Sequence, residues 1–274
     1  MSTSKHPVAL RLEQQVGRHA DSGTVLLATV MALPLVDGIF PALILAGAVD
    51  SVAGILQVGL LVFGGSATLA VILAEMDGTR REAIRSVALV GVIIVPLAAI
   101  EAALAPTIAN VLDLVVFERF AALVILAVAA KTASARIGEM LPRPAVIVGL
   151  GFVGSLDPSG AELAFVADPA LVAKGAAAAG VGVAFALVVA VLEPWLRHML
   201  DIDRFRFGSA IALGVLPFSI LEITPGSAPL AVLVVAALLA YDPSGEGVPQ
   251  ADAERGHTAV SDGGDDEPER APWM

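Results

Sequence analysis

The sequence predicts an all-α membrane protein, a polytopic helix bundle of about eight transmembrane helices arranged as two similar four-helix halves. Of its 274 residues, 57% are hydrophobic and only 16% are charged, whereas soluble domains average about 45–50% apolar and about 25% charged residues. Uncharged stretches recur that approach the ~20 residues a helix needs to cross a bilayer. Polar residues within these stretches also recur at a nearly constant offset, which indicates a duplication.

Eight apolar segments are the expected membrane spans. They cover residues 24–47, 52–74, 86–105, 115–135, 144–166, 171–193, 206–223 and 227–241. The last two are short for a hydrocarbon core of ~30 Å. The expected organisation is a cytoplasmic N-terminal segment (1–23), a first four-span half (24–135), a second four-span half (144–241) and an acidic, disordered tail (242–274).

Basic residues set the expected orientation. With eight spans, all 16 Lys and Arg residues except Arg119 and Lys174 fall on one side of the membrane. The positive-inside rule then places both termini in the cytoplasm of a multi-pass cell-membrane protein. The tail is acidic and rich in Gly, Pro and Ser, so it is expected to be disordered. Such a tail suits a high-salt cytoplasm and indicates a halophilic source.

An internal repeat relates the two halves. Asp157 follows Asp37 by 120 residues, and Glu222 follows Glu101 by 121. The other matched positions are Pro96 with Pro217 and Glu75 with Glu193. A repeat of four spans gives halves of the same orientation, and duplicated halves with interrupted helices at matching positions point to a central transport site.

Asp37 and Asp157 are the leading candidates for that site, because each lies in an apolar segment beside helix-breaking residues. A carboxylate at the centre of a bilayer costs roughly 2.5–3.5 kcal/mol and usually faces a cavity or an ion path. Proline removes a backbone donor, and carbonyls freed at membrane depth need protein or a wet cavity around them. The helix-breaking residues are Pro34, Gly38 and Pro41 around Asp37, and Pro158 and Gly160 after Asp157.

Other polar side chains complete the expected substrate or ion site. They are Ser159, Glu162, Glu101 and Glu222. Carboxylates, a hydroxyl and opened carbonyls are suitable ligands for a hard cation or a proton. A second interpretation stays open, in which Asp37 and Asp157 mark helix kinks and their carboxylates cap the half-helices that follow.

The composition excludes several kinds of chemistry. The chain has no cysteine, which rules out thiol catalysis, disulfides and Cys-ligated metals. Its four histidines lie outside the apolar segments and share no ligand spacing, so a His-based metal site is not expected. Metalloprotease, Walker and serine-hydrolase motifs are absent. We therefore expect no enzyme, no cofactor and no nucleic-acid partner.

Several segments resemble an uncharacterised haloarchaeal multi-pass membrane family of unknown function. They are HPVALRLEQ, LPLVDGIFPALILAGAVDS, FGGSATLAVILAEMDG, FERFAALVILAVAAKTASARIGE and LPRPAVIVGLGFVGSLDPSGAEL, which cover most of residues 6–165. The resemblance implies source and topology but no activity. A much weaker similarity runs to TerC-like membrane proteins, which are implicated in metal-ion handling. Their Asp-Asn motif is absent here, since Gly38 follows Asp37.

The sequence thus favours an integral membrane transporter or exporter of a cation or small solute, coupled to H⁺ or Na⁺ through carboxylates in the membrane. Its partners would be the lipid bilayer and the transported species. The alternative is a non-transporting membrane scaffold or accessory subunit, in which the same aspartates only fix helix bends.

Overall fold

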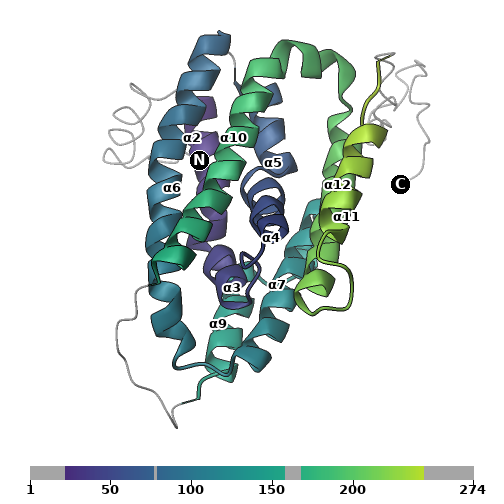
Figure 1. The fold of residues 1–274 in the computed structure, drawn as a ribbon. Coiled ribbons are helices and arrows are strands. Elements are labelled where there is room, and N and C mark those ends of the chain that lie inside the picture. Colours follow the sequence, from purple (N-terminus) through teal and green to yellow (C-terminus); the bar gives the residue numbers. More distant parts are fainter. Residues whose placement is uncertain (1–21, 77–78, 158–167, 244–274) are drawn as a thin grey trace, which may run out of the picture.

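The protein is described by a computed structural model that covers residues 22–76, 79–157 and 168–243. These residues form a bundle of helices without a strand (Figure 1). In chain order the helices are α2 (Ser22–Val36), α3 (Ile39–Leu45), α4 (Val52–Gln57), η1 (Val58–Phe63), α5 (Ser66–Ala70), η2 (Val71–Glu75), α6 (Arg80–Ala109), α7 (Leu114–Ala133), α8 (Ala135–Met140), α9 (Pro144–Gly154), α10 (Pro169–Met199), α11 (Ile202–Ile220) and α12 (Ala228–Leu239). The elements labelled η are π-helical.

Two helices are long and apolar enough to cross a membrane: α6, with 30 residues, and α10, with 31. Two bent pairs pass the same test when each counts as one span. These are α2 with α3, bent by 42°, and α4–η1 with α5–η2, bent by 47°. The described residues therefore hold two to four candidate spans, which is compatible with a membrane protein. The predicted all-helical class is confirmed.

Two of the expected spans are shorter than the sequence pattern suggested. α9 has 11 residues and α12 has 12, so each rises only about 16–18 Å against a hydrocarbon core of ~30 Å. α9 ends because Ser155 Oγ donates a hydrogen bond back to Gly151 O at 2.7 Å and Leu156 pairs with Leu112. The rest of that apolar segment, from residue 158, lies outside the described residues.

The helices that the expected repeat would pair differ in shape. At an offset of 120 residues, the bent segment α4–η2 corresponds to α10, which runs without a break. The bend lies at Gly64 and Gly65, whereas Ala184 and Phe185 occupy the matching positions. Glycine weakens a helix by about 1 kcal/mol relative to alanine. The second half therefore lacks the local cause of the bend.

Side-chain caps define where the long helices start. Thr79 and Glu82 form a reciprocal capping box at the start of α6, which satisfies backbone N–H groups that have no partner within the helix. Asp113, Asp168 and Asp201 accept backbone N–H groups at the starts of α7, α10 and α11. These carboxylates also favour the positive end of each helix dipole.

Small residues allow α6 and α10 to pack closely against each other. A Cβ at Gly91 of α6 would lie 2.5 Å from Val183 Cγ1 of α10, and one at Gly175 would lie 2.6 Å from Ala102 Cβ. Close approach through small residues is the usual way in which membrane helices associate. In Figure 1, α4 and α5 lie between α10 on one side and α11 with α12 on the other, while α2 lies beside α6.

Two phenylalanines pack at the centre of the bundle. Phe40 of α3 and Phe63 of η1 are both fully buried, with ring centroids 5.0 Å apart and ring planes at 67°. This edge-to-face arrangement is the favoured one for aromatic pairs. Since Phe40 follows one bend and Phe63 precedes the other, the contact joins the two bent helices where each changes direction.

Gly182→Ala should destabilise the protein, because α10 crosses the second bent helix at this residue. A Cβ there would contact Phe63 and lie 2.9 Å from Gly59 O and 3.3 Å from Gly64 N. Overpacking of this kind costs about 1–3 kcal/mol. Gly180→Ala in the same helix is the matched control. It meets nothing within 4 Å and should be neutral or stabilising. Thermal unfolding in detergent measures both, and equal shifts in the midpoint would contradict the close crossing.

Candidate functional site

The first helix break lies at Asp37 and Gly38. The Asp37 and Gly38 N–H groups still donate to carbonyls of α2, at 2.8 and 3.0 Å. Gly38 then adopts φ +73°, and α3 starts in a new direction. Pro41 has no N–H with which to bond the Asp37 carbonyl four residues earlier. The break that the sequence predicted here therefore has two local causes, a proline and a glycine in the left-handed region.

The second break lies at Gly64 and Gly65, where the sequence predicted one continuous span. Gly64 N–H donates to Gly59 O at 2.8 Å, a π-helical bond. Thr68 Oγ1 donates to Phe63 O at 2.8 Å, which satisfies a carbonyl left at the end of η1. The Gly-Gly pair, followed by serine and threonine, was the available sequence signal for this break.

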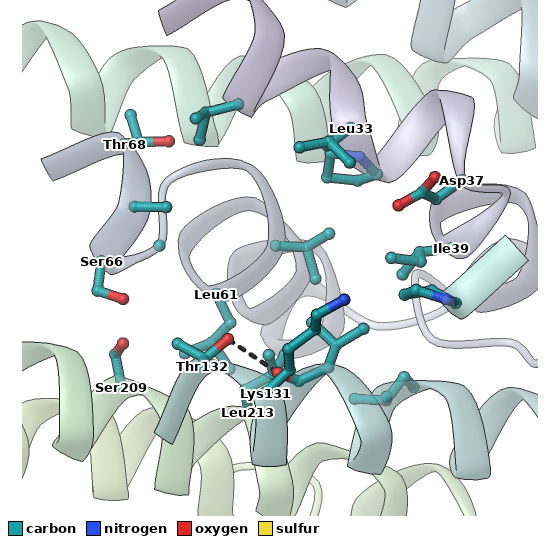
Figure 2. A pocket seen from close by; sticks show the side chains of 18 residues that line it. Leu33, Asp37, Ile39, Leu61, Ser66, Thr68, Lys131, Thr132, Ser209 and Leu213 are labelled. Atoms are coloured by element: carbon teal, nitrogen blue, oxygen red, sulfur yellow. Dashed lines mark hydrogen bonds between the residues drawn. The ribbon is translucent and has the colours of Figure 1, made fainter. Parts of the chain in front are cut away.

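Both breaks line one cavity of about 330 Å³, which lies among α2, η1, α5, α7 and α11 (Figure 2). This volume is at the lower end of the range for small-molecule sites, about 300–1,000 Å³. Most of the wall is apolar. The polar side chains that line the cavity are Asp37, Ser66, Thr68, Lys131, Thr132 and Ser209.

Asp37 and Lys131 supply the two charges of this cavity from different elements. Figure 2 shows the Asp37 carboxylate on the wall formed by the first break and the Lys131 amine extending from the α7 wall toward the interior. Across the part of the chain that the structure describes, neither side chain forms an ion pair. Gly138 of α8 packs on the Lys131 stem: a Cβ at Gly138 would lie 2.6 Å from Lys131 Cγ.

A second and more polar cavity of about 640 Å³ lies at the opposite end of α7. Asp50, Glu118, Arg119 and Glu222 line it, together with the buried side chain of Gln57. The Gln57 amide donates to Gly226 O, which ties α4 to the α11–α12 connection. Asp50 of this wall forms an ion pair at 2.9 Å with Lys174, which does not line the cavity itself. Glu118 and Glu222 are close enough to repel each other.

Glu222 lies in a backbone conformation that L-amino acids rarely adopt. It follows α11 with φ +57°, and its N–H donates to Ser219 O at 3.2 Å while Ile223 N–H donates to Phe218 O at 2.8 Å. This is the Schellman ending of a helix, which usually places glycine at this position. A glutamate here keeps a carboxylate on the cavity wall against a backbone cost of about 1 kcal/mol.

The structure separates the other predicted site residues. Asp157 is exposed beyond the end of α9, and its N–H donates to Val111 O at 3.0 Å. Glu101 is half-buried in α6, and its Oε2 has no hydrogen-bond partner among the residues described. Neither residue lines either of these two cavities. Pro34 lines the first cavity with Asp37, Glu222 lines the second, and Pro41 lies in α3. Pro158, Ser159, Gly160 and Glu162 fall outside the described residues.

Asp37 and Asp157 thus lie at different levels of the bundle. Gly38 is adjacent to Val148 of α9, and Pro144 at the start of that helix lines the first cavity. Asp157 instead follows the end of α9 and lies beside the α6–α7 connection. Over the described ranges, no group of three or more His, Asp or Glu side chains is placed to hold a metal ion. The first cavity therefore offers one carboxylate and one ammonium group, without a metal cluster.

The fold and this site define an apolar helical bundle with a small charged cavity between two broken helices. The chain is similar to a family of unknown function, DUF5794, over residues 94–221. The matched part includes Lys131 but neither helix break, and it ends one residue before Glu222. No curated protein and no solved structure matches the chain.

Glu222→Gly should raise the stability of the protein by about 1 kcal/mol, because glycine adopts the left-handed conformation at little cost. The thermal midpoint in detergent measures this. Glu222→Gln is the matched control, since it removes the charge and keeps the backbone strain. An equal gain for both variants would assign the effect to repulsion by Glu118 and would contradict the strain argument.

Proposed function

We propose that this protein is an integral membrane transporter of a small solute or cation, whose substrate cavity is the one between the two helix breaks. The observation that carries the proposal is that both breaks, Asp37–Gly38 and Gly64–Gly65, open onto one cavity that also contains charge. Broken helices at membrane depth persist where irregular backbone is buried in protein or lines a cavity, and transporters often build substrate sites from them.

The charge on Asp37 supports transport more than a purely structural bend. Both N–H groups at the break are satisfied by backbone carbonyls of α2, so the bend does not require the carboxylate as a cap. The α3 start likewise has no side-chain cap. A carboxylate retained at such a position is available to a cation, and coupling to H⁺ or Na⁺ would act through its protonation or its ion binding.

We propose a multi-pass topology in the cell membrane with eight membrane segments in two four-span halves and both termini in the cytoplasm. The segments would be α2–α3, α4–η2, α6, α7, α9, α10, α11 and α12, with α9 and α12 as the short ones. The connections that would face the cytoplasm carry most of the basic residues, including Arg80, Arg197 and Arg204, while Lys174 lies at the other end. This distribution fits the positive-inside rule.

Asp37→Asn should reduce ion flux at least tenfold, because a neutral amide neither carries a proton nor neutralises a cation. Proteoliposomes loaded with a pH-sensitive dye and placed in a Na⁺ gradient, then in a K⁺ gradient, measure the flux. Asp157→Asn is the matched control and should keep most of it, since Asp157 does not line the cavity. Wild-type protein that conducts no more than empty liposomes, or equal rates for wild type and Asp37→Asn, would contradict the proposal and favour a scaffold.

The topology has its own test, because the natural chain has no cysteine. Asn110→Cys, in the α6–α7 connection, should react with a membrane-impermeant maleimide on intact cells. Asp203→Cys, at the start of α11, should react only after lysis. Both positions are exposed in the fold. Labelling of both from outside, or of Asp203→Cys alone, would contradict the proposed orientation.

A further inference from the structure

We infer that the cavity between the helix breaks binds a small zwitterion with an apolar body, whose cationic group meets Asp37 and whose anionic group meets Lys131. The inference names the substrate class and so rests on the proposed function. It starts from the separation of the two charges. Asp37 and Lys131 line the same cavity, yet they form no ion pair within the described parts of the chain.

The two charges demand different partners. A bound metal cation would balance the charge of Asp37, but the Lys131 ammonium in the same cavity would repel that cation. A bound anion would balance the charge of Lys131, but the Asp37 carboxylate would repel that anion. A neutral solute would take water from both charged groups and return no charge to either, which is costly in an apolar surrounding. A molecule that carries both charges neutralises each side chain at once.

The apolar walls of the cavity indicate what the uncharged part of the ligand is. Most of the other lining side chains are aliphatic, among them Leu33, Leu61, Val62, Ile125, Val128 and Leu213. Burial of an apolar group against them contributes about 25 cal/mol per Å². Hydroxyls are present at Ser66, Thr68, Thr132 and Ser209, but three of them already donate to backbone carbonyls: Thr68 to Phe63 O, Thr132 to Val128 O and Ser209 to Arg206 O. An apolar body therefore fits better than a sugar or another polyol.

The position of Lys131 depends on α8. Lysine is a flexible point charge on a four-carbon stem, and Gly138 lies directly against that stem. A larger residue at 138 would overlap Lys131 Cγ and push the stem away. Gly138 is therefore a positioning residue, which acts on a ligand through Lys131 without a contact of its own.

Binding is tested on the purified full chain in detergent by the thermal shift at graded probe concentrations. Leucine, 3-methylbutylamine and 4-methylpentanoate share one aliphatic body. Leucine carries both charges, 3-methylbutylamine carries only the cationic group and 4-methylpentanoate carries only the anionic group. Proline and glycine betaine are added as further zwitterions. At least one zwitterion should stabilise the protein, and it should do so at concentrations at least tenfold lower than either singly charged probe. Stabilisation by no zwitterion, or equal stabilisation by a singly charged probe, would overturn the inference.

Variants assign the two ends of the ligand. Asp37→Asn and Lys131→Gln should each weaken the zwitterion at least tenfold, as expected for loss of a charged contact. Asp157→Asn and Lys174→Gln make the same chemical changes outside the cavity and should bind as wild type does. Gly138→Ala should weaken the zwitterion while the effect of 3-methylbutylamine, which needs only Asp37, stays unchanged. Unaltered binding in Lys131→Gln, which lies on an exposed position and should fold, would overturn the two-charge site.

The outcome separates this inference from the transport proposal. Zwitterion binding without flux of that zwitterion into proteoliposomes would leave the ligand class standing and overturn transport. Flux that needs Asp37, together with equal stabilisation by 3-methylbutylamine and leucine, would overturn the zwitterion and leave transport standing.

Discussion

The contact between Phe40 and Phe63 holds the two helix breaks together. Each ring lies within two residues of a break, and both are fully buried. The unbroken helix α10 makes room for the two rings through two glycines. These glycines are seven residues apart and therefore lie on one face of the helix. Gly182 contacts Phe63, and Gly175 has Phe40 Cζ 3.5 Å from where its Cβ would lie. The cavity between the breaks thus depends on an aromatic pair braced against an uninterrupted helix.

The sequence predicted the first break because its causes are local. Pro41 removes one helical hydrogen bond, and only glycine enters the left-handed region at Gly38 without strain. The second break was missed, although Gly64 and Gly65 are also local. Two glycines in an apolar run are compatible with both a bend and close helix packing, and Gly64 shows both here, since it lies at the bend and against Phe185 of α10. Pattern alone does not distinguish the two.

The end of α9 had no comparable signal. Residues 144–166 read as one apolar span, yet Leu156 pairs with Leu112 across more than forty positions, and Ser155 O accepts the Asp113 N–H at 2.7 Å. Such pairing depends on tertiary structure rather than on composition. It also explains why the two aspartates do not meet, since Asp157 lies beyond this pairing, whereas Gly38, next to Asp37, packs against Val148 in the middle of α9. In the sequence Lys131 is one of the basic residues expected on one side of the membrane, and its place in the cavity comes from the packing of α7 against α11.

Packing and polarity are distributed unequally in this bundle. The α6–α10 contact consists of small apolar residues that pack closely, a surface that favours one fixed arrangement. The separated charges of Asp37 and Lys131 and the strained Glu222 lie instead on cavity walls to which α7 and α11 contribute. Strain and unpaired charge persist only where the surrounding structure holds them, and they raise the energy of the state they occupy. A bound ligand that neutralises Asp37 and Lys131 would therefore act across this cavity, between the two bent segments on one side and the α7 and α11 walls on the other.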